Sequence, residues 1–209
     1  MDDFGLYFIV TKPHLPYRVL AEACVARGVK FLQLREKDFS DRDTLKAAEE
    51  IREVTEGTDT KLIINDRADL SRLVDADGLH LGQGDLTLEQ SLLFFPGKEK
   101  VRGLSTHSPE QARRAWQEKP DYIGFGPIFP TPTKKIPDPA VGTEQLGLIV
   151  AQSPVPVVAI GGLFPENLEE VISAGARNVC LVRHFMECQR EEELIKRIEG
   201  IQKMLEAAK

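Results

Sequence analysis

The side chains best suited to chemistry come directly after short apolar runs. Gln33, Arg35 and Lys37 alternate behind the apolar pair 31–32, so in an extended chain they point to one face. The planar fork of arginine and the point charge of lysine together suit a diphosphate. A triplet of this kind alone is also typical of a solvated strand end. The apolar pair before the triplet indicates that the triplet continues a buried strand, which favours a binding site over a solvated strand end.

Two aspartates stand in the same relation to other apolar runs. Asp66 follows the run 62–64, and Asp85 follows the run 78–81. Mg²⁺ is commonly held by one or two carboxylates together with ligand phosphates and water. Either aspartate alone is more simply explained as a helix cap. Two of them after neighbouring strands predict a Mg²⁺ site. The other aspartates of this region are interpreted as surface or turn residues: Asp69, Asp75 and Asp77.

The segment 121–135 combines a strand with a loop suited to anions. Its apolar run ends at Gly126-Pro127, and the loop behind it carries two hydroxyls and two ammonium groups, from Thr131, Thr133, Lys134 and Lys135. Two prolines in the loop reduce the entropy lost when it orders around a ligand. The segment is therefore expected to hold something anionic.

Short apolar runs alternate with longer amphipathic segments along the whole chain, and no linker or low-complexity tract interrupts them. Strands are predicted at 6–10, 31–34, 62–64, 78–81, 101–104, 122–125, 157–160 and 178–182. Helices are predicted near 16–27, 41–55, 67–74, 87–94, 108–118, 143–152, 165–174 and 190–207. The regular alternation indicates a single domain over residues 1–209.

Eight strand-helix units in this length predict an α/β fold, a single (β/α)₈ TIM barrel, with a doubly wound open sheet as the alternative. In a barrel the residues after every strand converge on one mouth. The loops after the last two strands often bind phosphate through backbone amides, which fits Gly161-Gly162. His80, within a predicted strand, is interpreted as a core histidine. Other polar side chains expected at the mouth are Ser105, His107, Arg183 and His184.

The composition argues against several classes of function. With a net charge of −6 and a pI near 5.4, the chain has no broad basic field for nucleic acid or a membrane surface. No apolar run approaches a membrane span, and the N-terminus is acidic where a signal peptide would be basic. We expect a cytoplasmic protein with small-molecule substrates, and a homodimer because such dimers are common. The cysteines lack disulfide or zinc spacing and are expected to be free thiols: Cys24, Cys180 and Cys188.

Six motifs resemble the thiamine-phosphate synthase family, in the family's order and over essentially the whole chain. They are QLREK at 33–37, IINDRADL at 63–70, DGLHLGQGD at 77–85, GLSTHS at 103–108, DYIGFGPIFPTPTK at 121–134 and VVAIGG at 157–162. The resemblance implies a Mg²⁺-dependent transferase that joins 4-amino-2-methyl-5-hydroxymethylpyrimidine diphosphate to 4-methyl-5-(2-phosphooxyethyl)thiazole. The products would be thiamine phosphate and diphosphate.

The resemblance also implies the roles of individual residues. The pyrimidine diphosphate is expected to contact Tyr7, Gln33, Leu34, Arg35, Glu36, Lys37, Asn65, Ser105 and Lys134. The catalytic residues among these would be Arg35, Lys37, Ser105 and Lys134. The thiazole phosphate is expected to contact Thr131, Pro132, Thr133, Gly162, Val182 and Arg183. The metal ligands would be Asp66 and Asp85.

The chain departs from the family pattern after the eighth predicted strand. The family usually places small residues there, often with a serine, where this chain has Cys180, Arg183 and His184. Arg183 would either bind the thiazole phosphate or point away from it. Two other functions stay open. The first is a thiazole tautomerase; such relatives tend to lose the diphosphate and metal residues and carry a histidine where this chain has Pro127. The second is a non-catalytic protein that binds a phosphate ligand on the same scaffold.

Overall fold

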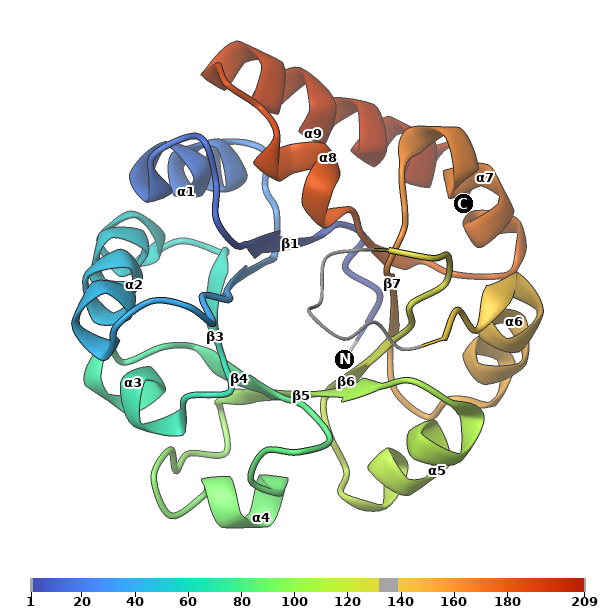
Figure 1. Ribbon diagram of the computed structural model, residues 1–209, viewed down its shortest axis with the longest axis horizontal. Helices are drawn as coiled ribbons and strands as arrows, with labels where there is room; N and C mark the ends of the chain where they lie inside the picture. Colours follow the sequence, from blue (N-terminus) through green and yellow to red (C-terminus); the bar gives the residue numbers. More distant parts are fainter. Residues whose placement is uncertain (1, 132–138, 209) are drawn as a thin grey trace.

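A ring of parallel strands surrounded by helices forms the body of the molecule (Figure 1). The structure is a computed structural model that describes residues 2–131 and 139–208. Its strands are β1 (Tyr7–Val10), β2 (Phe31–Leu34), β3 (Lys61–Asn65), β4 (Gly78–Leu81), β5 (Val101–Thr106), β6 (Tyr122–Phe125), β7 (Val157–Ile160) and β8 (Asn178–Cys180). They pair in sequence order, and a bridge between Leu6 and Val179 joins the last strand to the first. The predicted (β/α)₈ barrel is therefore confirmed, and the open sheet is wrong.

Helices lie around the outside of the strand ring (Figure 1). They are α1 (Tyr17–Ala26), α2 (Asp41–Thr55), α3 (Ala68–Leu73), α4 (Leu88–Ser91), α5 (Pro109–Gln117), α6 (Gly142–Gln152), α7 (Pro165–Ser173), α8 (Val182–Met186) and α9 (Glu191–Glu206). Three predicted starts are confirmed, because the hydroxyls of Ser40, Thr87 and Ser108 each accept a hydrogen bond from a backbone N–H of the first turn.

Two predicted boundaries are wrong. The last strand ends at Cys180, and Val182 begins the short helix α8 instead of ending a strand. The helix expected over 87–94 is reduced to α4, Leu88–Ser91. Phe95 turns back into the core with 2% of its surface exposed, which leaves the preceding apolar residues outside a regular helix. Apolar periodicity alone does not separate a helix from such a turn.

The core has two parts, on the two faces of the ring. The outer part packs strand side chains such as Phe8, Leu32 and Leu34 against the helices. The inner part fills the barrel with Tyr7, Ile9, Phe31, Ile63, Val101, Tyr122, Val158 and Cys180. Strands buried on both faces read as continuous apolar runs, which explains why the sequence marked them so clearly.

The amino-terminal end of the barrel is closed by aromatic rings. Phe4 packs against Phe31 with ring centroids 4.5 Å apart, and it also contacts Tyr7 and Tyr122. The N-terminal segment thus crosses one end of the ring (Figure 1), and Asn178 holds it by accepting hydrogen bonds from the backbone at Phe4 and Gly5. Ligand access is therefore directed to the opposite end.

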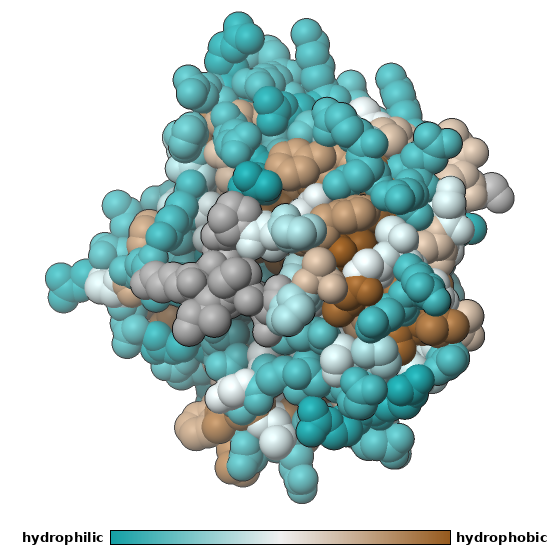
Figure 2. Space-filling model, turned by 45° about the vertical axis from the view of Figure 1, so that its right-hand side comes forward, coloured by the Kyte–Doolittle hydropathy of each residue, from teal (hydrophilic) through white to brown (hydrophobic). Residues whose placement is uncertain are grey.

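Hydrophilic side chains cover most of the face shown in Figure 2, with apolar residues in separate patches. The large exposed apolar side chains are Phe39, Leu73, Leu86, Leu92, Leu93, Phe94 and Leu148. None of the helices described is long and apolar enough to cross a membrane.

Candidate active site

A pocket opens at the carboxyl ends of the strands, inside the ring. Many of the residues expected to contact ligands line it: Tyr7, Gln33, Arg35, Asn65, Ser105, Thr131, Gly162, Val182 and Arg183. They come from all around the barrel and are separated by up to 176 residues in the chain, from Tyr7 to Arg183. Parallel strands bring them together because their carboxyl ends face the same side.

Other expected contacts lie away from this pocket or outside the described residues. Leu34 is 1% exposed and packs in the outer core. Pleating turns alternate side chains of β2 in opposite directions, so Gln33 enters the barrel and Leu34 leaves it. Three expected contacts, Pro132, Thr133 and Lys134, fall in the segment that the structure does not describe.

Glu36 has a structural role in the described residues. Its Oε1 accepts a hydrogen bond from the backbone N–H of Lys12 at 2.6 Å and another from the Tyr17 hydroxyl at 2.7 Å. These bonds tie the β2–α2 loop to the β1–α1 loop at the rim of the pocket. The expected direct contact between Glu36 and the pyrimidine diphosphate is therefore not favoured by the geometry, whereas a role in holding the rim is.

The two aspartates meet beside the ends of β3 and β4; neither they nor Lys37 line the pocket itself, although Asn65, the neighbour of Asp66 in the chain, does. Partial burial, followed by a hydrogen bond with Asp66, raises the pKa of the Asp85 carboxyl above its usual range. Asp66 also forms an ion pair with Lys37, with Nζ and Oδ2 2.9 Å apart. The backbone of Asp66 has φ near 62°, a left-handed conformation that aspartate tolerates better than most residues. Two adjoining carboxyl groups beside one ammonium group form a suitable place for a cation.

No group of three or more His, Cys, Asp or Glu side chains suited to a metal occurs among residues 2–131 and 139–208. A metal held only by protein ligands is therefore not indicated there. A pair of carboxylates instead fits Mg²⁺, which keeps water and takes further oxygens from a bound phosphate.

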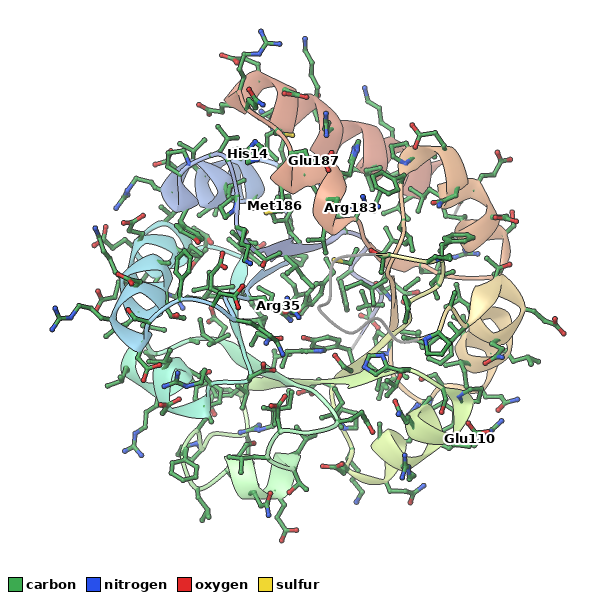
Figure 3. The ribbon with its side chains drawn as sticks, in the orientation of Figure 1. His14, Arg35, Glu110, Arg183, Met186 and Glu187 are labelled. Atoms are coloured by element: carbon green, nitrogen blue, oxygen red, sulfur yellow. The ribbon has the colours of Figure 1, made fainter. Side chains whose placement is uncertain are left out.

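Two arginines approach the pocket from different parts of the ring, Arg35 from the end of β2 and Arg183 from α8 (Figure 3). Neither forms an ion pair with a carboxylate in the part of the chain that the structure describes. The guanidinium of Arg183 lies over the ring of Phe164, with Cζ 4.8 Å from the ring centroid. Such stacking holds a cation in place without neutralising it. The pocket therefore has positive charge available for an anionic ligand.

A continuous set of hydrogen bonds crosses the barrel interior below the mouth. Gln33 Nε2 lies 2.8 Å from the Tyr7 hydroxyl, which lies 2.5 Å from the Tyr122 hydroxyl. The Tyr122 hydroxyl lies 3.0 Å from His80 Nδ1, and His80 Nε2 lies 2.8 Å from Ser105 Oγ. Burial raises the pKa of both tyrosines well above the usual range, so both hydroxyls keep their protons.

The glycines after β7 are required by packing as well as by any ligand. Gly161 and Gly162 have φ of 95° and 71°, and a Cβ on either would come within 2.7 Å of Pro127 or Phe129. The β7–α7 loop therefore lies directly on the loop after β6. This contact supplies a second reason for the glycine pair, in addition to the expected phosphate contact at Gly162.

His184 and Asp77 lie in different surroundings from those expected. His184 does not line the pocket and instead borders a groove beside α9, where burial lowers its pKa. Asp77 is more than a surface residue, because its Oδ2 accepts hydrogen bonds from Arg52 Nη1 at 2.9 Å and from the backbone N–H of Leu62 at 2.8 Å. Neither position could be assigned without knowing which elements lie side by side.

Tyr122, Phe164 and His80 are pocket residues whose roles sequence reasoning missed or understated. Tyr122 was hidden in an apolar strand, and Phe164 lies before the helix α7. The presence of His80 in the core is confirmed, but it belongs to the hydrogen-bonded interior instead of being isolated. A polar atom on an inward strand position was the available signal. The three cysteines are free and buried, as expected.

Comparison with known proteins gives a consistent relationship. Residues 6–185 match the family model described as "Thiamine monophosphate synthase". A protein of Synechocystis sp. named "Thiamine-phosphate synthase" is 42% identical over 180 residues, which cover 86% of this chain and 52% of that protein. A protein of the same name from Dictyoglomus thermophilum is 38% identical over 206 residues, covering 95% of this chain and 92% of that protein.

Solved structures agree with this relationship. A structure titled "Thiamine phosphate pyrophosphorylase from Pyrococcus furiosus" superposes with a TM-score of 0.85 and 30% identity, covering 99% of this chain and 97% of that one. A structure titled "Native KDPGal structure" gives a TM-score of 0.74 at 14% identity, and it supports the barrel fold alone.

Proposed function

Because the chain belongs to the thiamine monophosphate synthase family, we propose that its pocket binds two phosphorylated rings and joins them with Mg²⁺ in place. The chain is a transferase of thiamine biosynthesis with thiamine-phosphate synthase activity. Its substrates in this proposal are the pyrimidine diphosphate and the thiazole phosphate named above. The observation that carries the proposal is one pocket with two separate cationic places, at Arg35 and at Arg183.

The diphosphate is proposed to lie at the rim between the ends of β2 and β4. Arg35 offers a planar fork for two phosphate oxygens, and Lys37 offers a point charge beside Asp66. Asn65, on the pocket lining, supplies an amide for a further oxygen. Lys134 is proposed to add a second ammonium group from the segment outside the described residues.

Mg²⁺ is proposed to be held by Asp66 and Asp85 together with diphosphate oxygens. The donor set fits, because hard carboxylate oxygens suit this ion. Partial burial, and after it the neighbouring Asp66 carboxyl, raises the pKa of Asp85, and a cation would relieve the contribution of Asp66. When bound, the ion would neutralise charge that accumulates on the departing diphosphate. Lys37 occupies part of this place in the free protein by pairing with Asp66.

The thiazole phosphate is proposed to lie between the loops after β6 and β7 and the start of α8. Thr131, Gly162, Val182 and Arg183 line this side of the pocket. Pro132 and Thr133, outside the described residues, are proposed to complete the contact from the loop that carries Thr131. Arg183 provides the fixed charge in this region, so it is proposed to bind the phosphate instead of pointing away.

In this proposal the chain acts mainly by positioning the two substrates and by stabilising the charge on the leaving diphosphate. If the bond between the pyrimidine methylene carbon and the diphosphate oxygen breaks first, the bonding electrons leave with the diphosphate. The thiazole nitrogen then donates its electron pair to the methylene cation and carries no proton to be removed, so no general base is required. Arg35 and Lys37 stabilise the leaving group, while the apolar walls around Ile9 and Val158 keep water from the cation.

The alternatives are less well supported. The curated relatives compared are named as synthases, and the residues proposed for diphosphate and metal are intact where the tautomerase relatives tend to lose them. A binding protein without activity would have no need of the carboxylate pair beside a diphosphate site.

The direct test is to mix the purified protein with both substrates and to measure thiamine phosphate and diphosphate, with and without Mg²⁺. We expect equal amounts of the two products and no turnover after chelation of the metal. Tight binding of either substrate without product would refute the proposed reaction, and full activity after chelation would refute the metal.

A further inference from the structure

The hydrogen-bonded side chains inside the barrel form a single row, which we call the interior chain: Gln33, Tyr7, Tyr122, His80 and Ser105. Every step between neighbours is 2.5–3.0 Å long. Its two ends, Gln33 and Ser105, both line the pocket. We propose that all of these hydrogen bonds run in one direction, so that Ser105 donates its proton to the ligand and the Gln33 Oε1 accepts one.

The direction follows from the groups that can only donate or only accept. Gln33 Nε2 can only donate, so the Tyr7 hydroxyl accepts at this step. Tyr7 then has its own proton for the Tyr122 hydroxyl, and Tyr122 has its proton for His80 Nδ1. A neutral histidine that accepts at Nδ1 carries its proton on Nε2 and donates to Ser105 Oγ. The Ser105 proton is then left for the pocket.

The opposite direction at the two tyrosines would leave a buried proton without an acceptor. If the Tyr122 hydroxyl donated to Tyr7, the Tyr7 oxygen would receive two protons, and its own proton would have no further hydrogen-bond acceptor among the side chains that the structure describes. Tyr7 is 2% exposed and Tyr122 is 1% exposed, so water does not replace the missing partner. A buried donor without a partner is costly, and the single direction avoids it.

The barrel is shaped to permit this contact between Tyr122 and His80. Gly103 lies beside both, and a Cβ there would lie 2.2 Å from Tyr122 Cζ and 2.6 Å from His80 Nδ1. The backbone of Ser105 is fixed separately, because its carbonyl accepts a hydrogen bond from Gln83 Nε2 at 2.7 Å. The hydroxyl of Ser105 is thus aimed by His80 while its backbone stays in the sheet.

The polarity gives the pocket an acceptor at Gln33 and a donor at Ser105. An aminopyrimidine presents the complementary pair, because its amino group donates and its ring nitrogens accept. This step rests on the proposed function. His80, Tyr122 and Tyr7 are positioning residues in this arrangement, because they act on the ligand through the orientation of Ser105.

The first test is the protonation of His80 in the free protein, measured by nitrogen NMR on protein with ¹⁵N-labelled histidine. The chain has four histidines, and replacing His14, His107 and His184 in turn assigns the remaining resonance to His80. We expect a neutral ring with the proton on Nε2. A proton on Nδ1, or on both nitrogens, would overturn the inference.

A second variant tests whether the direction depends on Gln33. In Gln33→Glu an ionised carboxylate can only accept, so the row should reverse and the His80 proton should move to Nδ1 as the introduced carboxyl ionises. Retention of the Nε2 proton beside an ionised carboxylate would contradict the proposal. Tyr17→Phe removes a tyrosine hydroxyl that bonds to Glu36 outside the row, and it should leave His80 unchanged.

The ligand side is tested by calorimetry with 4-amino-2-methyl-5-hydroxymethylpyrimidine. Ser105→Ala should weaken its binding about 10-fold, the effect of one lost hydrogen bond, whereas Ser153→Ala, remote from the pocket, should not. Equal affinity of Ser105→Ala and the unchanged protein would overturn the donor role. The NMR measurement does not depend on turnover. If His80 carries its proton on Nε2 but the protein forms no thiamine phosphate, the proposed reaction is refuted and the inferred direction of the hydrogen bonds stands.

Discussion

Replacing Arg183 with alanine should weaken recognition of the thiazole phosphate without disturbing the fold. Arg183 forms no ion pair with a carboxylate among residues 2–131 and 139–208, so its removal leaves no charge unpaired. Its main contact is the ring of Phe164, 4.8 Å away. The effect of Arg183→Ala should therefore come almost wholly from the lost contact with the ligand.

The size of the effect can be bounded from the types of contact. A hydrogen bond to a charged group contributes about 1.5–3 kcal/mol, so kcat/KM for the thiazole phosphate should fall by about 10- to 150-fold. Phe164→Leu removes only the stacking that holds the guanidinium, which is about 0.5–1 kcal/mol or a 2- to 5-fold loss. Arg183→Lys keeps the charge without the planar fork and should fall between these two.

The assay is steady-state kinetics with each substrate varied in turn. KM for the thiazole phosphate should rise, and KM for the pyrimidine diphosphate should change little. Arg177→Ala is a matched control, because Arg177 lies before β8 at the opposite end of the barrel and donates to the carbonyls of Ile172 and Ala176. Equal effects on both substrates, or less than a 2-fold effect on kcat/KM for the thiazole phosphate, would refute the assigned role of Arg183.

Three further variants test the rim, a structural aspartate and the barrel interior. Because the pKa of Asp85 is raised in the folded protein, protonation of its carboxyl stabilises the metal-free fold at low pH, and this contribution is lost as the pH rises from the ordinary 3.8 through the raised value. In denaturant titrations Asp85→Asn should remove this decline in stability and abolish stabilisation by Mg²⁺. An unchanged pH dependence would count against the Asp66–Asp85 pair. Asp77→Ala should lower the free energy of unfolding by about 2–3 kcal/mol, because Arg52 and the Leu62 N–H lose their acceptor, and a loss below about 1 kcal/mol in urea titrations would contradict this. Gly103→Ala should destabilise the fold by about 3 kcal/mol through overlap with the Tyr122 ring, so normal stability by the same titration would contradict the close packing.

The fold was predictable because it is encoded by local patterns. Strands buried on both faces appear as short apolar runs, and the caps at Ser40, Thr87 and Ser108 mark where helices begin. These signals act over a few residues, so they are readable without knowing the neighbours. They failed at the end of the last strand, where Val182 has a strand-forming side chain but begins a helix.

The site was predictable only as a set of strand ends. The motif at 33–37 predicted a ligand-binding segment, but pleating sends Leu34 to the outer core while Gln33 enters the barrel, and Glu36 ties two loops together. Assigning the whole motif to ligand contact overlooks the fact that alternate side chains of a strand point in opposite directions. Gln33 and Arg35 line the pocket, whereas Leu34 and Glu36 support the scaffold.

The sequence by itself determined the order of the strands, the family relationship and the residue types at the mouth. Only the tertiary structure decided which of those residues meet. Tyr7 and Tyr122 are 115 residues apart in the chain, yet their hydroxyls are 2.5 Å apart because β1 and β6 face each other across the barrel. Closure of the ring brings such side chains together, and no local pattern in the sequence records the distance across it.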